Sequence, residues 1–324
     1  MRKRLSTALT GLALAAAIGL VPSTSAQADP DIDTVQARVD RLYHEAEQAS
    51  ERYNDAKLEL DALQRDLESL RADQERQDAD LGAVREQVKD TMLRQFEGQG
   101  ISAVGEVFVS DDPGAFLSQL STMSSYTSYQ DALLDDYQAE VASLEIRRTA
   151  TAKRLQQVRK TEERLAAEKA TIEEKHSEAE SLLDRLEEEE RAQVLSRGGT
   201  TVPSSVPASG RAAAAVQYAM AQVGDAYVYG AAGPSAFDCS GLTMMAWAQA
   251  GVALPHSSSA QYSSGVRVSS SDLQPGDLVF YYSPISHVGM YIGNGLIVHA
   301  ANPSSGVRVA ELYSMPYVGA VRPG

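Results

Sequence analysis

The segment Phe237-Asp238-Cys239-Ser240-Gly241 decides how the chain is interpreted, because it contains the only cysteine of the 324-residue sequence. The pattern predicts that an extended stretch ends here and that a helix begins at about Gly241. One cysteine excludes an internal disulfide and leaves an intermolecular disulfide, a buried structural thiol or a reactive nucleophile. A thiol at a helix start lies near the positive end of the helix dipole, which favours the thiolate. The residues downstream must decide between these alternatives.

Two histidines follow at positions that suit a Cys-His site. Beyond a turn at residues 274–277 the apolar period becomes two, which predicts strands at residues 278–282, 287–292 and 296–300. Gly293-Asn294-Gly295 predicts a hairpin between the last two strands. Alternation then sets His287 and His299 side by side, under the helix that carries Cys239. A lone strand histidine is usually structural, but two histidines with one cysteine favour a catalytic site.

The N-terminus has the pattern of a secretory signal peptide. Basic residues at 2–4 precede an apolar run at residues 9–21, and Ala26-Gln27-Ala28 provides the small residues of a cleavage site. The apolar run is shorter than the roughly 20 residues of a membrane-spanning helix. We therefore expect residues 1–28 to be a signal peptide and the mature chain to begin at Asp29, outside the cytoplasm.

The negative charge is concentrated in the N-terminal half. The net charge is -15; residues 1–28 carry +3 and the residues after Gly198 carry -1, so residues 29–197 carry -17. A strongly acidic segment repels nucleic acid and anionic membranes. The composition of 43% hydrophobic and 23% charged residues is ordinary for a soluble protein. We predict no nucleic-acid partner.

The same half predicts a long helical hairpin. Apolar or small residues between Val35 and Leu70 alternate spacings of four and three, as in a coiled-coil seam, before polar Gln74 and Gln77 interrupt it. Helix breakers at residues 98–113 predict a turn. A second helix, at about residues 115–197, has a weaker seam, and its expected partner is the first helix in an antiparallel coiled coil. Dimerisation is the alternative.

Two histidines of this half, His44 and His176, are interpreted as solvated helix residues, since no group here has metal or catalytic spacing. Residues 198–210 are rich in Gly, Ser and Pro and predict a flexible linker. Residues 29–197 are therefore expected to form the helical hairpin, and residues 211–324 a separate compact domain that is long enough to bury its own core.

The motifs of this domain resemble those of a known family. Asp238-Cys239-Ser240-Gly241, the stretch from His287 to Gly293, and Val298-His299-Ala300 resemble the catalytic motifs of the NlpC/P60 family of cell-wall cysteine peptidases. Tyr227-Val228-Tyr229-Gly230 and the stretch from Gly276 to Phe280 are similar to its accessory motifs. The resemblance covers residues 211–323 and implies a papain-like α+β fold. The N-terminal half is similar to the coiled-coil regulatory segments of secreted peptidoglycan hydrolases.

The resemblance also implies a role for each matching residue. Cys239 is the implied nucleophile, His287 the general base and His299 the polar residue that orients His287. Tyr227 is implied near the oxyanion, and Asp238 and Ser240 beside the substrate. No metal or organic cofactor is implied. His256 departs from the family pattern, and we interpret it as a cap of the next segment.

The function implied is a secreted endopeptidase that cleaves peptidoglycan stem peptides, at the γ-D-glutamyl–meso-diaminopimelate bond typical of the family. Two alternatives remain open: an amidase that cuts between sugar and peptide, and a non-catalytic coiled-coil regulator. We further hypothesise that the hairpin or the linker covers the cleft of Cys239 until a partner or a cleavage releases it. Family analogy suggests a division-associated membrane complex as that partner.

Overall fold

The computed structural model describes residues 32–96, 113–186, 188, 190–192, 202–203 and 205–324. The expected signal peptide, the turn between the long helices and most of the linker lie outside the described residues, so these expectations stay predictions. Within the described ranges, no helix combines the length and apolar character needed to cross a bilayer.

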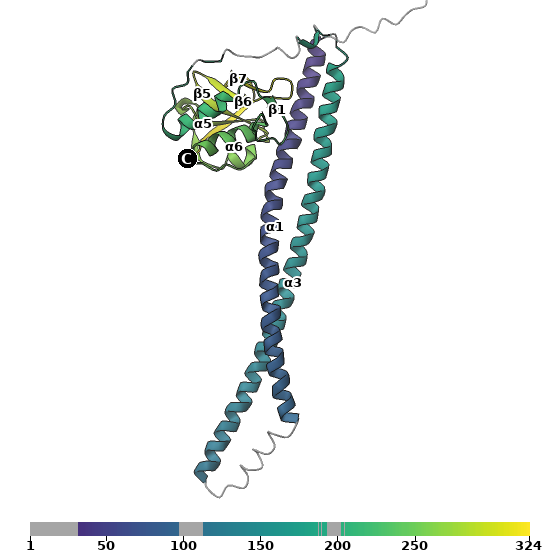
Figure 1. Ribbon diagram of the computed structural model, residues 1–324, viewed down its shortest axis with the longest axis vertical. Coiled ribbons are helices and arrows are strands. Elements are labelled where there is room, and N and C mark those ends of the chain that lie inside the picture. The colour runs from purple at the N-terminus through teal and green to yellow at the C-terminus, as the bar shows by residue number, and fades with distance from the viewer. Residues whose placement is uncertain (1–31, 97–112, 187, 189, 193–201, 204) are drawn as a thin grey trace, which may run out of the picture.

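Two long helices form the N-terminal half. Helix α1 (Ile32–Phe96) and helix α3 (Pro113–Leu183) lie side by side and run antiparallel, then diverge at the end far from the C-terminal domain (Figure 1). At about 1.5 Å per residue, each is on the order of 100 Å long. The predicted hairpin is therefore confirmed, although regular helix α3 ends at Leu183 rather than near residue 197.

The predicted seam holds the two helices together. Val39, Leu42 and Ala46 of α1 are buried with Ala179 and Leu183 of α3. A second buried cluster further along joins Leu63 and Leu67 to Val158. Exposed ion pairs such as Arg52 with Glu168 flank the seam. The alternation of four and three thus marks the residues that α1 turns towards α3.

The C-terminal domain is built on a six-stranded antiparallel sheet of order β3-β8-β4-β5-β6-β7. Its strands are β3 (Val266–Val268), β4 (Leu278–Tyr281), β5 (His287–Gly293), β6 (Leu296–Ala300), β7 (Val307–Glu311) and β8 (Tyr317–Arg322). The three predicted strands are β4, β5 and β6. The other three were not predicted: β3 is short, β7 carries Arg308 and Glu311, and β8 pairs with strands far from it in the sequence.

Two helices cover one face of this sheet. They are α5 (Gly210–Ala221) and α6 (Cys239–Gln249), and they bury Val216, Leu242 and Ala246 against Val288 and Met290 of β5. A short parallel pair, β1 (Ala226–Tyr227) and β2 (Ala236–Phe237), leads into α6. The remaining elements are α7 (Ser258–Gln261) and the 3₁₀ turn η1 (Ser270–Asp272). No residue of α1 or α3 belongs to this core, so the domain has a hydrophobic core of its own.

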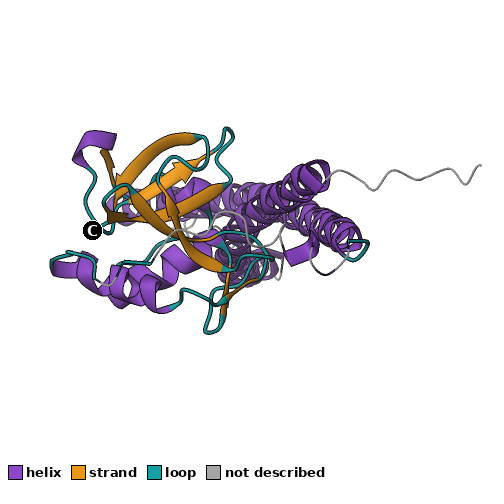
Figure 2. Ribbon diagram, turned by 90° about the horizontal axis from the view of Figure 1, so that it is seen from above, coloured by secondary structure: helices purple, strands orange, loops and turns teal. Residues whose placement is uncertain are grey.

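The domain packs against α1 near the N-terminal end of the hairpin (Figures 1 and 2). Tyr43, Glu47, Glu51 and Asn54 of α1 are each at most 6% exposed. Their spacing of four, four and three residues places them on one stripe of the helix, next to the seam. Helix α1 therefore has two buried faces, an apolar one towards α3 and a largely polar one towards the C-terminal domain.

Candidate active site

Cys239 is the first residue of α6, where Asp238 fixes the start of the helix. The side chain of Asp238 is the N-cap and accepts a hydrogen bond from the backbone N–H of Gly241 at 2.6 Å. Gly241 itself must lack a side chain, because a Cβ there would lie 2.2 Å from the carbonyl oxygen of Ala231. The motif thus holds the thiol at the first turn of a helix whose start is tightly packed.

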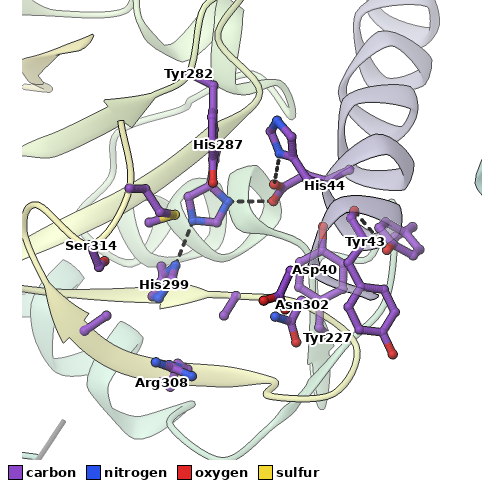
Figure 3. A pocket seen from close by; sticks show the side chains of 15 residues that line it. Asp40, Tyr43, His44, Tyr227, Tyr282, His287, His299, Asn302, Arg308 and Ser314 are labelled. Atoms are coloured by element: carbon purple, nitrogen blue, oxygen red, sulfur yellow. Dashed lines mark hydrogen bonds and ion pairs between the residues drawn. The ribbon is translucent and has the colours of Figure 1, made fainter. Parts of the chain in front are cut away.

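The two histidines of the hairpin contact each other directly. Nε2 of His287 lies 2.7 Å from Nδ1 of His299, and both rings are buried (Figure 3). Gly289 makes the approach possible, because a Cβ there would lie 3.3 Å from Cβ of His299 and 3.0 Å from Ile297. The predicted neighbourhood of the two histidines is therefore present.

Their position relative to α6 differs from the expectation. Helix α6 packs on the face of the sheet that carries Val288 and Met290, whereas strand alternation places His287 and Gly289 on the opposite face. The histidines therefore lie beside the first turn of α6 rather than under the helix. Helix α1, and not α6, covers them.

The thiol and the imidazole are close enough for proton transfer after a small movement. Sγ of Cys239, a ring nitrogen of His287 and a carboxylate oxygen of Glu47 all lie within 4.8 Å of one another. Because Nε2 of His287 faces His299, Nδ1 is the nitrogen left for the thiol or for Glu47. This arrangement provides a nucleophile, a base and a group that orients the base.

Helix α1 enters this arrangement with two carboxylates. Glu47 lies 2.6 Å from Nδ1 of His287. One turn further on, Glu51 accepts hydrogen bonds from Oγ of Ser240 at 2.7 Å and Oγ of Ser258 at 2.6 Å, and its Oε1 lies 3.6 Å from Sγ of Cys239. The side of the cleft that a substrate carbonyl must reach is therefore occupied by two acidic side chains of the same chain.

These carboxylates change the ionisation expected of Cys239. Burial, followed by the charges of Glu51, Glu47 and Asp238, raises the pKa of the Cys239 thiol well above its ordinary value. The expectation that the helix start favours the thiolate is wrong for this arrangement. Partial charges of a helix terminus are outweighed by desolvation and three neighbouring carboxylates.

The two acidic side chains differ in their own ionisation. Burial raises the pKa of Glu47, but the charge of His287 and its hydrogen bond outweigh this, so the net pKa lies below the ordinary value. Among the described residues, no cationic side chain forms an ion pair with Glu51, unlike Glu47 with His287. Burial and the charge of Asp238 raise its pKa to about 7, against the lowering effect of its hydrogen bonds to Ser258 and Ser240. Glu47 and His287 thus form a buried ion pair, while Glu51 is poised to titrate near neutrality.

The other predicted site residues lie around this centre. Ser240 donates to Glu51, so its hydroxyl points into the cleft. Oδ2 of Asp238 accepts from the backbone N–H of Gly230 at 2.9 Å and from Asn54 of α1 at 3.1 Å. The Tyr227 side chain is buried, and its hydroxyl has no hydrogen-bond partner in the described residues.

Several site residues were missed by the sequence interpretation. Glu47 and Glu51 have ordinary helix-surface spacing, and their proximity to Cys239 depends on contacts across 188 or more positions. His256 contacts Oδ1 of Asp238 at 2.8 Å and so supports the residue before the nucleophile. His44 was interpreted as solvated, but the centroid of its ring lies 3.9 Å from the ring centroid of Tyr282, and the side chain lines the cleft.

His176, the other histidine placed in solvent, also contacts the domain. The centroid of its ring lies 5.9 Å from the ring centroid of Tyr229 and 6.4 Å from that of Tyr43. Both histidine interpretations were therefore wrong, because the C-terminal domain covers this end of the hairpin.

The set Glu47, Cys239 and His287 has the donor types that a zinc ion binds. In this structure the Glu47 and His287 members already satisfy each other through their hydrogen bond. The ion pair between Glu47 and His287 therefore explains the geometry of this set of residues.

Comparison with known proteins places the domain in a family. Residues 224–321 match the NlpC/P60 family. The C-terminal domain of this chain therefore belongs to the NlpC/P60 family, with the cysteine and both histidines of the site inside the matched range.

The relatives share this domain but little else. A protein of Mycobacterium tuberculosis named as a probable endopeptidase is 52% identical over 107 residues, which are 33% of this chain and 28% of that one. One of Corynebacterium glutamicum, also named as a probable endopeptidase, is 45% identical over 118 residues, 36% of this chain and 56% of that one. A solved NlpC/P60 domain of the peptidoglycan hydrolase SagA is 35% identical, over 34% of this chain and 97% of that one, with a TM-score of 0.33. The chain thus spans between about a quarter and about half of the length of the two probable endopeptidases, and nearly all of the solved SagA domain.

Proposed function

We propose that this chain is a secreted peptidoglycan endopeptidase that hydrolyses stem peptides, at the γ-D-glutamyl–meso-diaminopimelate bond. The observation that carries the proposal is the buried contact of 2.7 Å between His287 and His299 beside the thiol of Cys239. The family of the domain and the endopeptidase names of its relatives support the same reaction class.

The first half of the reaction forms a thioester. Nδ1 of His287 takes the proton of Cys239, while His299 accepts the Nε2–H of His287 and holds the ring in that tautomer. The sulfur attacks the amide carbonyl, and the negative charge on oxygen is stabilised by the backbone N–H of Cys239 and the hydroxyl of Tyr227. His287 then protonates the departing amine, the C–N bond breaks and the acyl group stays on sulfur.

The second half returns the free enzyme. His287, now neutral, takes a proton from a water molecule, which attacks the thioester carbonyl. The C–S bond breaks, the peptide leaves as a carboxylic acid that releases its proton to solvent and becomes a carboxylate, and the thiolate with the imidazolium of His287 is restored.

The contacts of Glu51 support an acidic substrate. Its carboxylate is bound by the hydroxyls of Ser240 and Ser258, with the thiol of Cys239 alongside. A stem peptide also carries carboxylates, and one that approaches Cys239 meets the same two hydroxyl donors. We therefore assign Ser240 to substrate binding, as the motif implied, and add Ser258. Asp238 is assigned an indirect role in substrate binding, because it accepts a hydrogen bond from the backbone N–H of Gly230 and so holds that loop beside the cleft.

We also propose that α1 inhibits the enzyme in the closed arrangement. Glu47 forms with His287 the ion pair that the thiolate would otherwise form, and Glu51 fills the space in front of the thiol. Activity then requires a partner that moves α1 away, and the acidic hairpin is the surface offered to it. Family analogy points to a membrane complex rather than to nucleic acid.

The experiment is the digestion of purified sacculi by the full mature chain and by its Glu47→Ala/Glu51→Ala variant, followed by product masses. The proposal expects fragments cut within the stem from the variant, none when Cys239→Ala is added, and few from the unaltered chain. An intact stem freed from muramic acid would instead establish the amidase. No fragments from any of the chains would favour the non-catalytic regulator.

A further inference from the structure

Helix α1 leaves part of the cleft open as a cavity of about 310 Å³ beside the two histidines (Figure 3). Its walls include Asp40 and His44 of α1 on one side, and His299 and Arg308 of the sheet on the other. The cavity adjoins the catalytic residues, since Glu47, Tyr227 and His287 also line it, but neither the reaction scheme nor the inhibitory contacts give a role to Arg308. A cavity of about 300 Å³ is at the small end of ligand sites and suits a single amino-acid residue.

The contacts of α1 order the cleft along one direction. At one end of the cleft, the hydroxyl of Ser259 donates a hydrogen bond to Asp55 of α1. Moving towards the N-terminus of α1, Glu51 contacts Cys239 and Glu47 contacts His287. Asp40, further still, lines the cavity. At about 1.5 Å per residue, the axial distance from position 51 to position 40 is about 16 Å. The cavity therefore lies past His287, at the opposite end of the cleft from the serine hydroxyls.

The position fixes which half of the substrate reaches the cavity, if the proposed function holds. His287 must protonate the departing amine, so that nitrogen lies between Cys239 and His287. The acyl part then extends towards Ser240 and Ser258. The residue that carries the amine extends past His287 and enters the cavity.

The cavity lining includes unpartnered hydrogen-bond donors. Nε2 of His299, the hydroxyl of Tyr227 and Nε of Arg308 are all buried and have no hydrogen-bond partner in the described residues. Because Nδ1 of His299 accepts from His287 in the active tautomer, Nε2 of His299 must carry the ring proton. All three atoms are then donors, and buried polar groups of this kind require an acceptor.

We propose that Arg308, with Nε2–H of His299, binds a carboxylate on the residue that follows the cleaved bond, a diamino acid of the stem peptide. This proposal rests on the proposed function and adds its leaving-group specificity. Arg308 supplies a permanent positive charge and a planar set of N–H donors that match a carboxylate.

The test is a binding measurement, which needs no turnover. Calorimetry uses the full mature chain with Glu47→Ala, Glu51→Ala and Cys239→Ala, so that the cleft is open and the peptide is not cut. The two probes are γ-D-glutamyl-diaminopimelate with free carboxylates and the same peptide with the diaminopimelate carboxylates converted to carboxamides. We expect the carboxylate peptide to bind about 10- to 100-fold more tightly, as charge-assisted hydrogen bonds do.

The preference should depend on one arginine. Arg308→Gln should make the two peptides bind within about 2-fold of each other, and Arg308→Lys should restore part of the difference. Arg267→Gln is the matched control, because Arg267 is exposed on β3 and lies over the ring of Tyr262. The proposal would be overturned if the two peptides bound equally to the triple variant that retains Arg308. It would also be overturned if Arg308→Gln left the preference for the carboxylate peptide undiminished.

The two proposals fail in different ways. If sacculi are never cut but the carboxylate preference depends on Arg308, the proposed function is wrong and the binding site remains. If stem peptides are cut but the carboxylate peptide binds no more tightly than the carboxamide peptide, the proposed endopeptidase activity is supported and the role of Arg308 is wrong. In the active Glu47→Ala/Glu51→Ala chain, Arg308→Gln should raise KM more than it lowers kcat, since Arg308 contacts only the leaving residue.

Discussion

The carboxylate of Glu47 lies 2.6 Å from Nδ1 of His287, which is the nitrogen that must face the thiol of Cys239 during catalysis. A cysteine peptidase is normally activated by a thiolate–imidazolium pair, in which each charge stabilises the other. Here a carboxylate of α1 supplies the anion. The imidazolium is satisfied, the nearby negative charge disfavours a thiolate, and Cys239 remains a neutral thiol. In the proposed inhibition, Glu47 takes the place of the thiolate beside His287, and Glu51 adds to the penalty on a charged Cys239.

Replacement of Glu47 by alanine should activate the full mature chain. Removal of one member of a buried ion pair costs about 3–5 kcal/mol, because the other charge is left without a partner. That cost falls on the closed arrangement alone, so we expect at least a 10-fold faster release of soluble fragments from labelled sacculi. Glu68→Ala is the control, since Glu68 is an exposed residue of the same helix away from the domain. An unchanged rate in Glu47→Ala would show that this ion pair does not hold the enzyme closed.

Inhibition should weaken as the pH rises from about 4.5 to about 7, because of Glu51. Its pKa is about 7 in the closed arrangement, against the ordinary value of 4.5 expected when α1 is displaced. Closure therefore takes up a proton between about pH 4.5 and 7, is favoured below this window and is weakened as the pH rises through it. The titratable groups near Glu51 are Asp238, which caps α6, Cys239 in its first turn, His256 before α7, and Glu47 one turn away on α1; the charge of Asp238 adds to the penalty that burial places on the Glu51 carboxylate.

The measurement compares the full chain with Glu51→Gln, which cannot titrate at this position. Between pH 5.5 and 8 the activity of the unaltered chain relative to Glu51→Gln should rise by about 30-fold, from the two pKa values. The ratio cancels the pH dependence of the reaction itself, because Cys239 and His287 are present in both chains. A flat ratio, or one that falls with pH, would contradict the titration of Glu51.

The contact between His287 and His299 could be predicted from the sequence because it is local. The two residues sit on adjacent strands joined by Gly293-Asn294-Gly295, and alternation alone places them on one face. The start of α6 at Asp238 and Cys239 is similarly encoded in a short cap motif. Such features depend on hydrogen bonds between residues a few positions apart.

The polar face of α1 could not be predicted in the same way. Glu47 and Glu51 lie beside an apolar seam, where acidic residues normally face water, and nothing in their spacing separates a solvated stripe from a buried one. Their burial follows from a domain more than 150 positions away in the sequence. Strand β8 was missed for the same reason, because its partners β3 and β4 lie far before it in the sequence. Strand β7 follows β6 directly and was missed because Arg308 and Glu311 interrupt its apolar pattern.

His299 should act through His287 rather than on the substrate carbonyl. In the Glu47→Ala chain, His299→Ala should lower kcat by about 100-fold, since a misplaced base costs on that order, with a smaller change in KM. His299→Gln keeps a carbonyl oxygen that can accept the Nε2–H of His287, and it should recover most of the lost rate. If alanine and glutamine lower kcat equally, orientation by an acceptor is not the role of this position.

The ionisation of Cys239 can be followed without substrate, by the rate at which iodoacetamide alkylates its thiol. In the unaltered chain the buried thiol has a strongly raised pKa, so alkylation should be slow at neutral pH and should increase only under alkaline conditions. The chain with Glu47→Ala and Glu51→Ala loses two of the three carboxylates that oppose the thiolate, while the helix start and the imidazolium of His287 remain. Alkylation should then be faster by at least 10-fold at pH 7 and should stay fast down to about pH 5–6, as for a thiolate–imidazolium pair. Adding His287→Ala should abolish the fast reaction at low pH, whereas Glu68→Ala should leave the slow profile of the unaltered chain. If alkylation stays slow at neutral pH after both carboxylates are removed, the raised pKa of Cys239 is caused by the catalytic domain itself and not by α1.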